Sequence, residues 1–86
     1  MLNLIYAPIF MRQYKKLEPA LQEEILEKIK IFENENNQTS LKIHKLHGQL
    51  SGKYSFSVNY KIRVVFEYLS KKEIAILTVG DHEIYN

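Results

Sequence analysis

The chain of 86 residues is 45% hydrophobic and 26% charged, an ordinary globular composition that leaves room for one small domain over residues 1–86. The absence of cysteine excludes disulfides, thiolate metal sites and cysteine nucleophiles. The longest apolar runs have four residues, too few to cross a bilayer, and no secretory leader is visible, so we expect a cytoplasmic protein without a membrane partner.

The net charge of +2 is unevenly distributed along the chain. Residues 1–17 sum to +3, residues 18–35 to −4, residues 36–66 to +5 and residues 67–86 to −2. The 36–66 segment contains no acidic residue, and its positive field suits a polyanion such as nucleic acid. Lysines on an ordinary solvated surface give the same pattern, so both interpretations stay open here.

The first half of the chain predicts a strand followed by two helices. Apolar residues alternate over residues 2–6, which favours a short strand that ends at Pro8. Pro8 and Pro19 can each open a helix. The second helix has a solvated acidic face, and the polar stretch 34–40 after it predicts a loop. Its apolar stripe at helical spacing consists of Leu21, Ile25, Ile29 and Phe32.

The second half changes to the period of a β-sheet. Alternation over residues 54–60 and the apolar segments 62–69 and 73–79 predict three strands, with Gly80 and Asp81 breaking the last one. The order β-α-α-β-β-β predicts a single small α+β domain. Its antiparallel sheet carries the first strand at an edge and both helices packed on one face. The aromatic residues expected in the core are Tyr54, Phe56, Tyr60, Phe66 and Tyr68.

Few groups in this chain can carry chemistry. The spacing of His44 and His47 suits a metal only on a helix, and the lack of a nearby carboxylate or cysteine argues against a metal site. The three glycines match no phosphate-binding motif, which disfavours nucleotide-driven chemistry. The serines at positions 55 and 57 lie in a strand pattern, so a serine nucleophile elbow is not supported.

The remaining cations and imidazoles suit cleavage of RNA by its own 2′-hydroxyl, which needs a base, an acid and a fixed positive charge but no metal. A hairpin centred on residues 70–72 puts Arg63 opposite about residue 79, so His82 would lie a few residues beyond it. Alternatively, Arg63 only pairs with Glu67 on the same strand face, and His82 is an ordinary surface histidine. The residues alone leave both interpretations open.

Four segments carry a family resemblance: residues 44–48 (HKLHG), 50–52 (LSG), 54–68 (YSFSVNYKIRVVFEY) and 80–85 (GDHEIY). Together with the order of elements, they resemble toxins of the RelE/ParE superfamily of type II toxin–antitoxin systems, over essentially the whole chain. The ending is more similar to the RelE and YafQ branches, which cleave messenger RNA, than to the ParE inhibitors of DNA gyrase.

The resemblance implies a ribosome-dependent endoribonuclease that cuts messenger RNA in the ribosomal A site, with no metal or other cofactor. It also implies a cognate antitoxin protein whose carboxyl-terminal segment wraps the toxin. Two alternatives are a ParE-like gyrase inhibitor without catalysis and an inactive homologue that only binds its antitoxin. In the ribosome-dependent endoribonuclease, the segment 36–66 would face the ribosome and the messenger.

The resemblance also implies roles for individual residues. Arg63 matches the arginine that stabilises the phosphate, and His82 matches the histidine that acts as general acid. His44 would be the base or a phosphate ligand, and Tyr85 would stack on a base or orient the phosphate. Asn59 and Arg63 stand where YafQ-like toxins have a histidine and an aspartate, which leaves the base open. The expected nucleic-acid contacts are Lys42, Lys45, Lys53 and Lys61.

Overall fold

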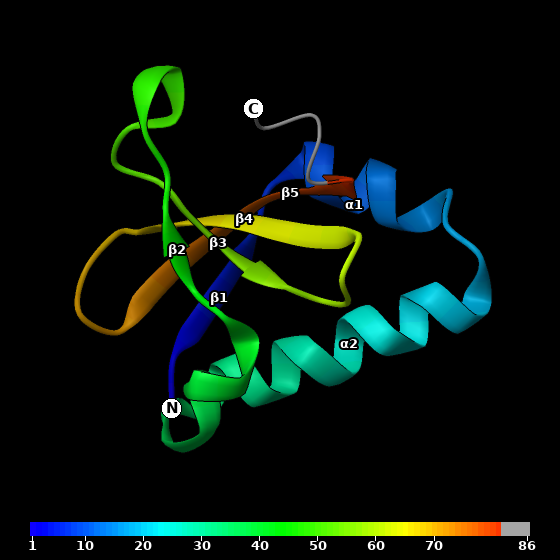
Figure 1. The fold of residues 1–86 in the computed structure, drawn as a ribbon, viewed down its shortest axis with the longest axis horizontal. Coiled ribbons are helices and arrows are strands. Elements are labelled where there is room, and N and C mark those ends of the chain that lie inside the picture. Colours follow the sequence, from blue (N-terminus) through cyan, green and yellow to red (C-terminus); the bar gives the residue numbers. More distant parts are fainter. Residues whose placement is uncertain (82–86) are drawn as a thin grey trace.

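The structure is a computed structural model that describes residues 1–81, apart from the side chains of residues 35–37. Within these residues, a five-stranded sheet is covered on one face by helices (Figure 1). The elements are β1 (Asn3–Tyr6), α1 (Pro8–Lys15), α2 (Pro19–Glu33), the 3-10 helix η1 (Glu35–Leu41), β2 (His44–Lys45), the 3-10 helix η2 (Gly48–Leu50), β3 (Tyr54–Ser57), β4 (Ile62–Tyr68) and β5 (Glu73–Asp81). None of the helices in the described part is long and apolar enough to cross a membrane.

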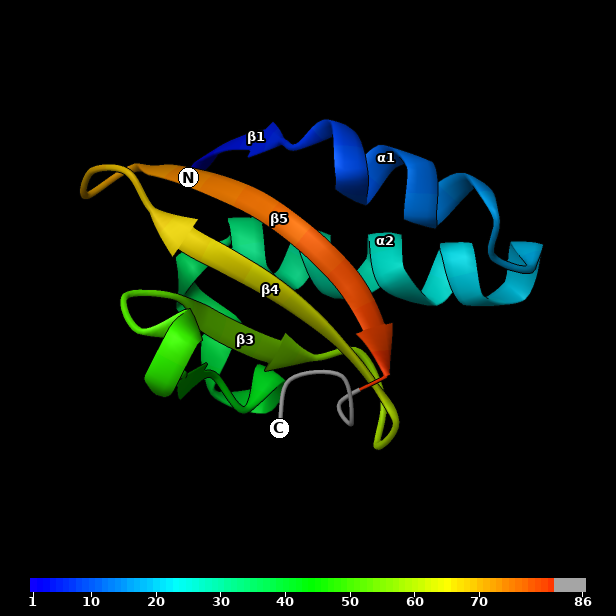
Figure 2. The same ribbon diagram turned by 90° about the horizontal axis from the view of Figure 1, so that it is seen from above.

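The strands follow the order β1-β5-β4-β3-β2 across the sheet, and Figure 2 shows β1, β5, β4 and β3 side by side. β3, β4 and β5 form an antiparallel meander, and β1 joins β5 in parallel at one edge. The predicted α+β fold is therefore confirmed. β2 was not predicted, because two residues are too few to show alternation, and it exists through its pairing with β3 at the other edge.

α2 places its apolar stripe against the sheet, as its spacing predicts. Ile25, Ile29 and Phe32 are buried, and the ring of Phe32 lies 4.9 Å from that of Phe56 and 4.6 Å from that of Phe66. Pro19 opens the helix at its first turn. Since α2 contacts the even-numbered residues of β3 and β4, the odd-numbered residues lie on the opposite face, called here the open face.

Two expected strand boundaries and one expected loop are wrong. β3 ends at Ser57, because the chain turns back over residues 58–61. β5 continues through Gly80 and Asp81, because β4 pairs with both and this pairing outweighs the weak strand propensity of glycine and aspartate. The stretch after α2 forms η1, whose Gln38 side chain donates to the Phe32 carbonyl at 2.8 Å.

Two of the aromatic residues expected in the core are exposed. Tyr60 is 91% exposed because it lies in the turn after β3, and Tyr68 is 43% exposed at the far end of β4. Phe56 and Phe66 are buried as predicted, and Tyr54 is half-buried against the same cluster. Alternation alone assigned these residues to one face, but it gave no information on where the strand ends.

A β-bulge in β5 sets the register on which the open face depends. Phe66 pairs with Ile76 and Val65 with Thr78, so Leu77 is the extra residue. The bulge reverses the side-chain alternation, so the side chain of Val79 lies in the core. The backbone N–H of Val79 donates to the side-chain oxygen of Gln13 in α1 at 2.9 Å. The extra residue also moves the partner of residue 63 from the predicted 79 to 80.

Candidate active site

Cross-strand pairing gathers polar side chains on the open face. Ser57 pairs with Arg63, and Arg63 pairs with Gly80 on its other side. The Arg63 guanidinium donates through Nη1 to the Ser57 hydroxyl, which fixes its direction. Arg63 is therefore an oriented, half-buried cation.

A groove of about 340 Å³ begins at Arg63 and runs along the turn between β3 and β4. We call it the basic groove, and its lining residues are Lys28, Ser40, Lys42, Ser57, Val58, Asn59, Tyr60 and Arg63. Three of them are cations, and none of these lining side chains in the described part of the chain is acidic. A concave surface lined by positive charges concentrates anions, because its low-dielectric walls focus the electric field of these charges.

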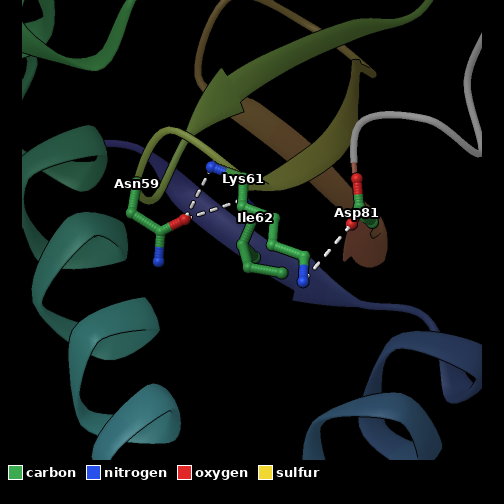
Figure 3. Close-up of polar contacts among 4 residues, drawn as sticks. All are labelled: Asn59, Lys61, Ile62 and Asp81. Carbon is green, nitrogen blue, oxygen red and sulfur yellow. Dashed lines mark hydrogen bonds and ion pairs between the residues drawn. The ribbon is translucent and has the colours of Figure 1, made fainter.

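Asn59 fixes the turn that forms one wall of the basic groove (Figure 3). Its side-chain oxygen accepts hydrogen bonds from the backbone N–H groups of Lys61 at 2.9 Å and Ile62 at 2.8 Å. Its side-chain nitrogen donates to the Glu24 carboxylate of α2, also at 2.9 Å. This asparagine therefore holds the turn to the helix, which is a structural role at one of the two positions where YafQ-like toxins were expected to carry a catalytic group.

Replacing Asn59 by alanine should lower the free energy of unfolding by about 1–3 kcal/mol, because two backbone N–H groups and one carboxylate lose their partner. Urea unfolding followed by circular dichroism measures this change. Glu24→Ala is the matched control: it removes only the bond to the helix and should cost less. Equal stability of Asn59→Ala and the wild type would contradict the role of this side chain in the turn.

No protein-family model and no curated protein matches the chain. Solved structures do match. YafQ from E. coli strain BL21(DE3) has a TM-score of 0.78 and 14% identity, over 98% of this chain and 97% of YafQ. A YoeB/ParE toxin from Agrobacterium tumefaciens has a TM-score of 0.74 and 17% identity, over 94% of this chain and 99% of that one. In the heterotetrameric YoeB–YefM toxin–antitoxin complex from Staphylococcus aureus, the matching chain has a TM-score of 0.72 and 24% identity, over 95% of this chain and 98% of that one.

The chain has the RelE/ParE toxin fold. The predicted resemblance is thus confirmed for the fold. Both a YafQ and a YoeB/ParE toxin match over nearly their whole lengths, so the comparisons show the shared fold and do not select one branch.

On this RelE/ParE fold, His44 lies on the same face as Arg63. In β2, His44 pairs with Ser55 of β3. Arg63 pairs with Ser57, which lies two residues further along β3. Two strand spacings and two residue rises separate the two Cα atoms by roughly 12 Å. The two side chains therefore need a substrate between them to act together. His82 and Tyr85 lie outside the described residues.

The four predicted lysine contacts have different surroundings. Lys42 lines the basic groove, and Lys45 is exposed on the edge strand β2. The ammonium group of Lys53 lies 4.0 Å from the Glu67 carboxylate, and that of Lys61 lies 3.9 Å from the Asp81 carboxylate. Glu67, the alternative partner considered for Arg63, thus pairs with a lysine. Exposed pairs of this kind contribute at most about 1 kcal/mol, so a phosphate can displace the carboxylate.

His44 and His47, whose spacing would suit a metal ion only on a helix, do not lie on a helix. His44 is in β2, and His47 precedes η2 in an extended conformation. Within residues 1–81, no group of three histidine, aspartate or glutamate side chains is placed to hold a metal ion.

Sequence reasoning missed two residues of the basic groove. Lys28 belongs to α2, whose charged face was expected to be solvated, but it is half-buried and lines the groove. Tyr60 was assigned to the core, although it is the residue after Asn59 in a turn. The sequence contained a signal for the second, because asparagine side chains often bond to the backbone two residues later and so form turns.

Proposed function

We propose that this protein is the toxin of a type II toxin–antitoxin system and an endoribonuclease that cleaves messenger RNA on the ribosome. The observation that carries the proposal is the position of Arg63, whose guanidinium is fixed on the open face of a RelE/ParE toxin fold beside a groove lined by cations. Forked guanidinium donors suit the oxygens of a phosphate.

The proposed reaction needs no metal. The 2′-hydroxyl oxygen of the RNA attacks the adjacent phosphorus as a base removes its proton, and the 5′-oxygen of the next nucleotide leaves as an acid protonates it. The products are a 2′,3′-cyclic phosphate and a free 5′-hydroxyl. Arg63 stabilises the extra negative charge on the phosphate in the transition state. We assign the acid to His82, the base or a phosphate contact to His44, and orientation of the phosphate or base to Tyr85.

An antitoxin protein is the proposed partner of the folded toxin. Neighbouring folds come from the YoeB–YefM complex and from the RelBE2 toxin–antitoxin complex of Mycobacterium tuberculosis. This chain leaves an apolar groove of about 220 Å³ between its helices, lined by Tyr6, Phe10, Met11, Tyr14 and Leu26. Burial, and to a smaller extent the electrostatic influence of Glu33 and Tyr14, raises the pKa of the Tyr6 hydroxyl. Three of these side chains, Tyr6, Met11 and Leu26, are exposed, and clustered exposed apolar side chains of this kind mark a protein contact.

Primer extension on cellular messenger RNA after a short pulse of expression tests the proposal. Cuts should appear within translated codons for the wild type and disappear for the double variant Arg63→Ala/His82→Ala. Lys71→Ala, in the exposed turn between β4 and β5, is the control and should cut as the wild type does. Intact messenger with arrested growth would favour gyrase inhibition, and intact messenger with normal growth would favour a module that only binds its antitoxin.

A further inference from the structure

Beyond Arg63, the basic groove holds two more cations that the proposed chemistry does not use. Lys28 comes from α2 and Lys42 from the segment between η1 and β2, so three elements distant in the sequence each bring a positive charge to one groove. Glu24, about one helical turn before Lys28 on α2, has its carboxylate bonded to Asn59. Such a cluster binds an anion, and the anion that recurs along RNA is the backbone phosphate.

Lys28 differs in burial from three other charged residues of α2. Glu23, Glu27 and Lys30 are exposed, whereas Lys28 is half-buried and lines the groove. A half-buried lysine can pack its apolar stem against the protein while its ammonium group stays in contact with water. Lys28 is therefore the positive charge of α2 that is placed to meet a ligand in the groove.

Lys42 has a backbone conformation that disfavours lysine. Its φ of 53° is in the left-handed region, which glycine and asparagine adopt far more readily than residues with long side chains. Backbone outliers of this kind concentrate at functional sites, where the surrounding structure holds them in place. Here the side chain supplies a cation to the basic groove.

Tyr60 adds an aromatic ring at the rim of the same groove. It lines the groove and is nevertheless 91% exposed, on a turn that Asn59 holds to α2. A single exposed tyrosine elsewhere needs no explanation. Beside three cations and on a fixed turn, an exposed ring provides a surface on which an unpaired base stacks, whatever its sequence.

We infer that the basic groove is a subsite for single-stranded RNA, in which Lys28 and Lys42 bind the phosphate of a nucleotide next to the cleaved one and Tyr60 stacks on its base. The inference rests on the proposed RNA substrate. It adds a second nucleotide position, on the α2 side of Arg63, that fixes the strand so that the cleaved phosphate lies at the guanidinium.

Fluorescence anisotropy with the full-length protein tests the inference directly. The probe is a labelled single-stranded RNA whose 2′-hydroxyls are methylated, so that it cannot be cleaved. Tyr60→Ala should weaken binding by about 5- to 100-fold, and Tyr60→Phe should bind as the wild type does, because it keeps the ring. Lys28→Gln and Lys42→Asn should each lower the slope of log Kd against log salt by about 0.7. Lys30→Gln, on the exposed side of α2, is the matched control and should leave this slope unchanged.

The possible outcomes separate this inference from the proposed function. Wild-type affinity in Tyr60→Ala and Lys28→Gln would overturn the subsite, as would equal binding of a duplex of the same length or no binding by the wild type at low salt. Primer extension would still decide cleavage independently. Binding that depends on Tyr60 and Lys28, with intact cellular messenger, would support the subsite and contradict the proposed nuclease. Thermal unfolding of each variant, expected to match the wild type, checks that the fold is intact.

Discussion

Replacing Arg63 by alanine should reduce the rate of RNA cleavage by about 10²- to 10³-fold, the usual effect of losing a fixed donor to a transition-state oxygen. Arg63→Lys should recover only part of this loss. It keeps the charge but loses the planar fork, and with it the oriented contact to Ser57. Single-turnover cleavage of messenger RNA on programmed ribosomes measures these rates with the purified protein.

Ser57→Ala separates orientation from charge at this position. It removes the hydroxyl that the guanidinium contacts, while the backbone pairing of residues 57 and 63 persists. We expect a smaller loss of rate than for Arg63→Ala. An Arg63→Ala protein that folds normally and cleaves at the wild-type rate would disprove the assigned role of this arginine.

Replacing Phe32 by alanine should lower the free energy of unfolding by about 3–5 kcal/mol, because the side chain is fully buried and its removal leaves a cavity. Its ring contacts those of Phe56 and Phe66, so the cavity would open where α2 meets the sheet. At about 0.05–0.15 kcal/mol per residue, a domain of this size has a total stability of about 4–13 kcal/mol, so this loss is a large share of it. Urea unfolding of the purified variant measures the effect.

Tyr68→Ala is the matched control for the core substitution. Tyr68 lies at the margin of the same aromatic cluster, 5.4 Å from the ring of Phe66, but is 43% exposed. Its removal should therefore cost much less. Similar urea midpoints for the two variants would show that the centre of the cluster does not hold α2. Because α2 carries Lys28 and Glu24, a weakened Phe32 contact should also disturb the basic groove.

The sequence by itself determined the elements that repeat a pattern over many residues. The stripe of α2 and the alternation of the three later strands were sufficient for the order of elements and the α+β class, because periodic burial is a local property of the chain. The predicted strand boundaries were wrong where pairing between strands, or a turn held by a side chain, overrides local propensity. Gly80 and Asp81 stay in β5 because β4 pairs with them, and Tyr60 leaves β3 because Asn59 makes a turn.

For the site, the sequence identified Arg63 and the acid-free segment that contributes Lys42, and the family resemblance assigned the remaining roles. Only the tertiary structure decided which of these cations share a groove. Lys28 and Tyr60 stand 32 positions apart, and the sequence contained no sign that they line the same surface. Their juxtaposition depends on how α2 packs across the sheet and on the turn that Asn59 holds, which are long-range contacts that no local pattern encodes.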